Sequence, residues 1–124
     1  MSENGKTNIV VMWTVSPENV AEGDRIFESH AKWITGHARE GDEALLSYRI
    51  SKGPELSNPV DPGSAPTGDT VFVLDEFYAS PAGVVEHWRL ARDTWQDLPD
   101  FMDWTSKAKK VVTLHSGTTV QGLW

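Results

Sequence analysis

Residues 9–17 read Ile-Val-Val-Met-Trp-Thr-Val-Ser-Pro, and they indicate a strand that is followed by a helix. β-Branched and aromatic residues dominate its first seven positions, which is typical of a β-strand. Ser16 and Pro17 then supply a helix N-cap and a first helical residue, so we expect the strand to run directly into a helix. The pair Ser80-Pro81 follows another apolar stretch and predicts a second strand-to-helix step.

Hydrophobic periodicity extends this pattern along the chain. The first helix is expected from Pro17 to Arg39 or Glu40, and Gly41 lies where a helix stop belongs. The second helix begins at Pro81 and is expected to end or kink at Pro99. The remaining expected elements are strands over 44–50 and 70–78, a long Pro- and Gly-rich loop over 51–69, a short helical piece over 100–107 and a last strand over 110–119.

The order of these elements is βαββαβ. This order predicts a ferredoxin-like α+β fold, an antiparallel sheet with helices on one face, as a single domain over residues 1–124. Water should then cover the other face of the sheet, yet the first and third strands are apolar on both faces. Val10 and Met12 oppose Val11 and Trp13, for example. A second cover is needed, and we predict a homodimer that packs sheet to sheet.

Composition excludes several classes of protein. The 124 residues carry 11 Lys and Arg against 18 Asp and Glu, a formal net charge of -7, and no Cys. The acidic balance argues against nucleic acid as a partner, and the lack of Cys excludes disulfides and thiolate metal sites. No apolar run is long enough for a membrane span, and the N-terminus lacks a signal-peptide core. We therefore expect a cytoplasmic protein with no membrane partner.

Two histidines lie at the centre of the apolar face of the first predicted helix. His30 and His37 flank Trp33 on that face, and they are either core histidines with hydrogen-bond partners or pocket residues that act as a general base. A metal ion shared by the two is not expected, because seven helical residues separate them by ~10.5 Å. Metal ligation would need further ligands, for example His87 or His115.

Two more histidines and an acid pair complete the candidates. His87 is expected on the flank of the second helix, either as a packing residue or as a proton acceptor beside Trp88. His115, in the last strand, is expected to be structural. Asp75 and Glu76 are neighbours on a strand and point to opposite faces, so one of them faces inward to cap, to pair with Arg49 or to orient a histidine. No nucleophile elbow, P-loop or dinucleotide fingerprint occurs, so no cofactor and no metal are predicted.

One stretch of the chain resembles a known family. Glu76-Phe77-Tyr78-Ala79-Ser80, followed by Val84 and His87, is similar to the pattern of the antibiotic biosynthesis monooxygenase family. Arg39-Glu40-Gly41 followed by Leu46-Ser47-Tyr48 resembles the turn of that family into its second strand. The resemblance implies a dimeric α+β barrel and a monooxygenase that needs no cofactor.

This resemblance leads to one enzymatic hypothesis and two alternatives. In the first, His30, His37 or His87 removes a proton from a small phenolic or quinol-type aromatic molecule, which then reacts with O2. Trp33, Tyr48 and Trp88 would hold the flat substrate, and Glu76 would support it. The second is a non-catalytic dimer that binds a small apolar or aromatic ligand or serves as a structural partner. Its pocket would be closed, or lined by Trp and aliphatic residues with the histidines fully hydrogen-bonded. The third is a lyase or isomerase of the polyketide-cyclase kind, which needs no O2.

Overall fold

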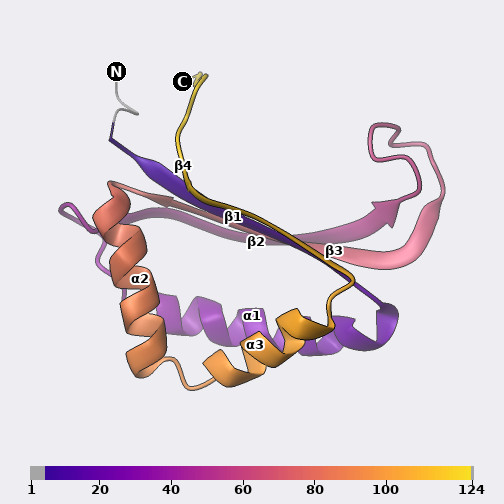
Figure 1. Ribbon diagram of the computed structural model, residues 1–124, viewed down its shortest axis with the longest axis horizontal. Coiled ribbons are helices and arrows are strands. Elements are labelled where there is room, and N and C mark those ends of the chain that lie inside the picture. The colour runs from indigo at the N-terminus through magenta and orange to yellow at the C-terminus, as the bar shows by residue number, and fades with distance from the viewer. Residues whose placement is uncertain (1–4, 124) are drawn as a thin grey trace.

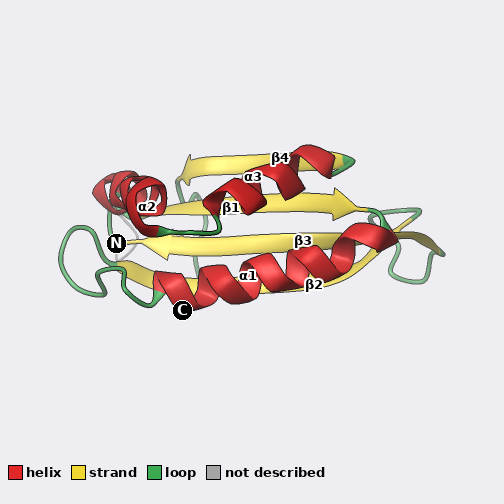
Figure 2. Cartoon of the chain, turned by 90° about the horizontal axis from the view of Figure 1, so that it is seen from below, coloured by secondary structure: helices red, strands yellow, loops and turns green. Residues whose placement is uncertain are grey.

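The computed structural model describes residues 5–123, which form a four-stranded antiparallel sheet in the order β2-β3-β1-β4. All of the α-helices lie against one face of this sheet (Figures 1 and 2). The predicted ferredoxin-like βαββαβ arrangement is therefore confirmed. Within residues 5–123, no helix combines the length and the apolar character that a membrane span requires.

Strand β1 (Thr7–Val15) runs into the short 3-10 helix η1 (Pro17–Asn19) and then into α1 (Val20–Ile34), as the sequence predicts. Helix α1 is shorter than expected, because it ends at Ile34 and not at residue 39 or 40. The hydroxyl of Thr35 donates to the carbonyl of Lys32, and the Gly36 amide donates to the carbonyl of Trp33, so the chain leaves the helix in a tight turn. His37 consequently lies after this turn and not on the helix.

The prediction of a long loop over residues 51–69 is wrong. Strand β2 (Leu45–Leu56) and strand β3 (Pro66–Tyr78) continue through most of it as a two-stranded ribbon that projects beyond the sheet (Figure 1). Only residues 57–65 connect the two strands. Pro54 is tolerated because β2 is an edge strand, where a missing amide hydrogen faces no partner strand on the outer side.

Helix α2 (Pro81–Thr94) begins at the predicted cap, where the Ser80 hydroxyl accepts from the Ala82 amide. It ends before Pro99, which lies in the first turn of α3 (Leu98–Lys107), so Pro99 starts a helix and does not end one. Strand β4 (Lys110–Gly117) follows and stops two residues earlier than expected.

An aromatic cluster fills the space between the sheet and α1 and α3. The ring centroid of Trp13 lies 5.1 Å from that of Phe27 and 5.6 Å from that of Trp104, and the Trp104 centroid lies 5.3 Å from that of Phe72. Gly23 permits this packing, because a Cβ there would lie 2.6 Å from the Trp104 ring. This half of the core is closed and apolar, and polar residues gather toward α2.

Within residues 5–123, no element covers the other face of the sheet (Figure 2). Met12 on β1 pairs with Val73 on β3 and with Val112 on β4, and paired residues point to the same face. Met12 is 41% exposed and Val112 is 62% exposed. An apolar surface of this kind is typical of a protein interface.

Candidate functional site

Glu76 lies at the centre of a polar cluster inside the fold. Strand alternation directs it inward between Leu74 and Tyr78, and its side chain is fully buried. The Tyr78 hydroxyl donates to Oε1 at 2.5 Å, whereas Oε2 has no hydrogen-bond partner among the described residues. Burial raises the pKa of Glu76 to about 7, against the lowering effect of the Tyr78 hydrogen bond, and the charge of Asp75 raises it further.

His30 approaches Glu76 from α1, on the buried face that the helical periodicity predicts. Its Nδ1 forms a 2.8 Å hydrogen bond with the hydroxyl of Tyr48 on β2. Its Nε2 lies 3.9 Å from Glu76 Oε2. Burial lowers the pKa of His30 to about 4, so the imidazole is neutral at pH 7.

His87 approaches Glu76 from α2. The sequence places it on the helix flank, and this is wrong: it is one of the most buried residues of α2, because its ring packs against the rings of Trp33 and Trp88. Its Nδ1 lies 3.7 Å from Glu76 Oε1 and has no hydrogen-bond partner in the part of the chain that the structure describes. Burial, followed by the nearby His30, His37 and His115, lowers the pKa of His87 to about 3.

The cluster is thus a carboxyl group between two neutral imidazoles. Of the three groups, only Glu76 has a pKa near neutrality, so the cluster exchanges its proton with solvent near pH 7 through this carboxyl. The two nitrogen-to-oxygen distances are longer than ordinary hydrogen bonds, which leaves donor and acceptor atoms unused in a buried place.

A small cavity adjoins the two histidines. Its volume is about 20 Å³, enough for a single water molecule but not for an aromatic ring. Apart from His30 and His87 its walls are apolar: Ile9, Val11, Phe27, Leu74, Trp88, Ala91, Trp95 and Phe101.

Within residues 5–123, the same three side chains form the one group whose ligand atoms lie close enough together to hold a metal ion. Ligand atoms of His30, Glu76 and His87 lie within 4.8 Å of one another. A tetrahedral ion with bonds of about 2.1 Å needs its ligands about 3.4 Å apart. The separations of 3.9 and 3.7 Å are wider, so an ion would have to draw the three side chains closer together.

The other predicted site residues are distributed around this cluster. The ring centroid of Trp33 lies 5.4 Å from that of His30 and 5.6 Å from that of His87. His37 is buried but does not line the cavity, and its Nδ1 bonds to the carbonyl of Ala38. His115 is exposed, and its Nε2 accepts a hydrogen bond from the Trp88 indole.

Sequence reasoning gave no role to two residues that the structure brings into the site. Tyr78 holds the Glu76 carboxyl, and the alternation of β3 was the available signal, since positions 76 and 78 share a face. Trp95 packs against His30 with ring centroids 4.9 Å apart. No periodicity could have paired it with His30, because it lies beyond the end of α2.

Comparison with known proteins supports the fold. No protein-family model matches the chain, and no curated protein sequence matches it. A dimeric ferredoxin-like protein from an uncultured marine organism superposes with a TM-score of 0.62 at 14% identity, over 95% of this chain and 97% of that chain. The chain has the ferredoxin-like fold.

Two further solved structures share this fold. A candidate antibiotic biosynthesis monooxygenase from Deinococcus radiodurans gives a TM-score of 0.54 at 18% identity, over 95% of this chain and 99% of that chain. A hydroxynitrile lyase from Passiflora edulis gives a TM-score of 0.58 at 14% identity, over 95% and 97% of the two chains. At these identities the likeness extends to the fold alone, and the predicted ferredoxin-like fold is confirmed.

Proposed function

We propose that this protein is a cofactor-independent monooxygenase that removes a proton from a small phenolic or quinol-type aromatic molecule. One observation carries the proposal: the buried atoms Glu76 Oε2 and His87 Nδ1 have no hydrogen-bond partners within residues 5–123, and His87 lines a cavity. A purely structural histidine cluster would be expected to satisfy these atoms, since an unpaired buried polar group costs about 1–3 kcal/mol. Such costs are typical of sites where the groups are needed for chemistry.

His87 is the proposed base. Its Nδ1 faces the Glu76 carboxyl, so Nε2 is the nitrogen that is free to take a proton. An ionised Glu76 stabilises the imidazolium that forms, as the carboxylate does in a His-carboxylate pair. His30 is the second proposed base and is fixed by Tyr48, whereas His37, which does not line the cavity, is not needed in this scheme.

The reaction balances without a further reductant. For an anthrone, the base removes a proton and leaves a delocalised carbanion that passes electrons to O2. One oxygen atom replaces the two hydrogens of the CH2 group as a ketone, and the other oxygen leaves as water with those two hydrogens. The substrate thereby loses four electrons, and O2 gains four.

We also propose that the working form is a homodimer. Its support is the uncovered apolar face around Met12 and Val112, together with the description of a structural neighbour of the same fold as dimeric. Two copies that pack sheet to sheet would remove this surface from water.

Oxygen uptake tests the proposal. Purified protein, stripped of metals, is mixed with a panel of anthrones and hydroquinones, and O2 consumption is followed with an electrode. We expect uptake by the wild type and a loss of at least 100-fold in His87→Gln, the usual scale for a general base. His115→Gln is the matched control and should keep its activity. Product formed under nitrogen would instead support the lyase or isomerase alternative, and no turnover in either atmosphere would refute catalysis on these substrates.

A further inference from the structure

The inner cavity is too small for an aromatic substrate, but a second hollow lies directly outside it. This groove has a volume of about 550 Å³ and opens between α1 and the segment that joins α2 to α3. Its walls include Ser29, Lys32, Trp33, Thr94 and Trp95. Trp95 belongs to both the groove and the inner cavity, so its side chain stands between the two.

The stacked indoles of Trp33 and Trp95 separate the groove from the inner cavity. The rings of Trp33 and Trp95 have centroids 5.6 Å apart and planes inclined by 22°. On their inner side, Trp95 packs against His30 at 4.9 Å and Trp33 packs against His87 at 5.6 Å. The direct way from the groove to the two imidazoles therefore leads past this pair.

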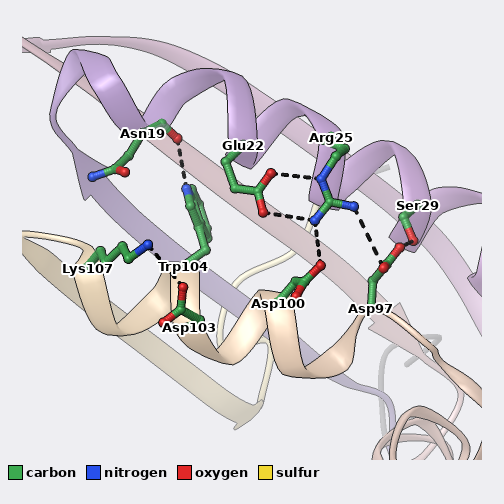
Figure 3. A network of polar contacts seen from close by, with 9 residues as sticks. All are labelled: Asn19, Glu22, Arg25, Ser29, Asp97, Asp100, Asp103, Trp104 and Lys107. Atoms are coloured by element: carbon green, nitrogen blue, oxygen red, sulfur yellow. Dashed lines mark hydrogen bonds and ion pairs between the residues drawn. The ribbon is translucent and has the colours of Figure 1, made fainter.

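Trp95 is the more movable of the two indoles. It follows the last residue of α2 with an extended backbone (φ -88°, ψ 107°), on the short connection to α3. Its Nε1 donates to the Ser29 hydroxyl, which in turn donates to Asp97 (Figure 3). Trp33, in contrast, is part of helix α1, and its Nε1 donates to Thr94.

The charges of the groove indicate the class of ligand. Lys32 pairs with Glu28 at 3.3 Å, and Arg25 lies 3.7 Å from Asp97 (Figure 3). Arg25 also pairs with Glu22 at 2.7 Å and with Asp100 at 2.8 Å, so both cations of the groove have carboxylate partners and neither is left for an anionic ligand. Indole faces with hydroxyl groups beside them suit a flat, uncharged aromatic molecule that carries a hydroxyl group.

We propose that the groove is an outer binding site for a flat phenolic molecule and that Trp95 swings aside to let this molecule reach the inner cavity, which His30 and His87 line. The site deepens the proposed function, on which it rests for its role, but its binding and opening can be measured without turnover. Trp95 acts as a specificity-determining residue, since the space that it vacates limits the width of the ring that passes.

Diethyl pyrocarbonate labelling tests the proposal, because this reagent modifies neutral imidazoles that it can reach. The rates at each histidine are measured by peptide mass spectrometry at pH 7, with 2-naphthol as the phenolic probe. Trp95→Ala should raise the rate at His30 at least tenfold, and saturating 2-naphthol should reverse most of that rise. Trp95→Phe keeps a ring in place and should change the rate less than threefold.

Two histidines of the chain serve as internal references. His115 is exposed and should react at the same rate in every variant, whereas His37 is buried away from the groove and should stay slow. An unchanged rate at His30 in Trp95→Ala, an equal rise at His37, or a failure of 2-naphthol to protect His30 would overturn the proposal.

A milder variant covers the case in which Trp95→Ala does not fold. Ser29→Ala removes the hydrogen bond to Trp95 and keeps the indole, and a rise of about fivefold at His30 is expected for the loss of one such bond. No rise in this variant would then overturn the proposal. If labelling and protection are as expected but no O2 is taken up, the proposed function is refuted and the proposed groove site stands. If O2 is taken up but labelling does not change, the groove site is refuted and the proposed function stands.

Discussion

Replacing Glu76 by Gln should change how stability depends on pH. Burial holds the pKa of Glu76 at about 7 in the fold, against 4.5 for the unperturbed group. The raised pKa means that the folded state prefers the protonated carboxyl. The free energy that the protonated Glu76 contributes to folding is therefore fully present below pH 4.5 and is lost as the pH rises through 7. At about 1.4 kcal/mol per pH unit the loss amounts to about 3 kcal/mol, most of it between pH 5 and pH 8.

Glutamine resembles the protonated acid and cannot ionise. Its carbonyl can still accept from Tyr78, and His30, His87 and Tyr48 surround the position in both proteins. Glu76→Gln should therefore be close to the wild type at pH 5 and more stable by about 2–3 kcal/mol at pH 8.

Urea denaturation at the two pH values measures this difference. The midpoint and slope of each transition give the free energy of unfolding, with circular dichroism as the signal. Glu28→Gln makes the same chemical change at an exposed carboxylate and should stay within about 0.5 kcal/mol of the wild type at both pH values. A stability difference for Glu76→Gln that is the same at pH 5 and pH 8 would refute the assignment of a raised pKa to this carboxyl.

Three further outcomes are expected. The oxygenase rate should rise with pH through about 7 because Glu76 must be ionised to stabilise the imidazolium, and a pH-rate profile of Glu76→Gln that keeps this limb would contradict the scheme. Gly23→Ala should lower stability by about 1–3 kcal/mol in thermal or urea unfolding, since its Cβ would lie 2.6 Å from Trp104, whereas Gly53→Ala meets open space and serves as the control. Met12→Asp on the uncovered face should convert the dimer to a monomer, as measured by sedimentation, and Val60→Asp on the exposed β2–β3 turn is the control. A wild type that sediments as a monomer at micromolar concentration would refute the dimer proposal.

The order of the elements follows from short local signals. Ser16-Pro17 and Ser80-Pro81 mark both strand-to-helix steps, since serine caps a helix and proline fits its first turn. The two apolar faces of β1 also follow from its composition. These features are local, so one sequence is enough to predict them.

The ribbon over residues 52–69 could not be predicted in this way. Proline and glycine in that stretch are typical of loops, but an edge strand leaves one side of its backbone unpaired and therefore tolerates Pro54. Whether a stretch forms an edge strand or a loop depends on the register with its partner, which is tertiary information. The predicted end of α1 was wrong because the turn that ends the helix lies at Gly36 and not at Gly41.

The candidate site could be predicted only in part. Helical periodicity indicated that His30 faces inward, and strand alternation indicated that one of Asp75 and Glu76 does so. That His30, Glu76 and His87 come together depends on how α1 and α2 cross β3, which no pattern within one element contains. The same holds for Trp95, whose place beside His30 is set by the turn between α2 and α3.

The far end of the β2–β3 ribbon offers a place for engineering. Residues 57–65 close on themselves: the Ser57 amide donates to the Ala65 carbonyl, and the Ser64 hydroxyl donates to the carbonyls of Asn58 and Asp61. This turn lies at the opposite end of the molecule from α2, which carries His87 (Figure 1). An affinity tag or a fluorescent label inserted at this tip would report on the protein while leaving its interior chemistry untouched.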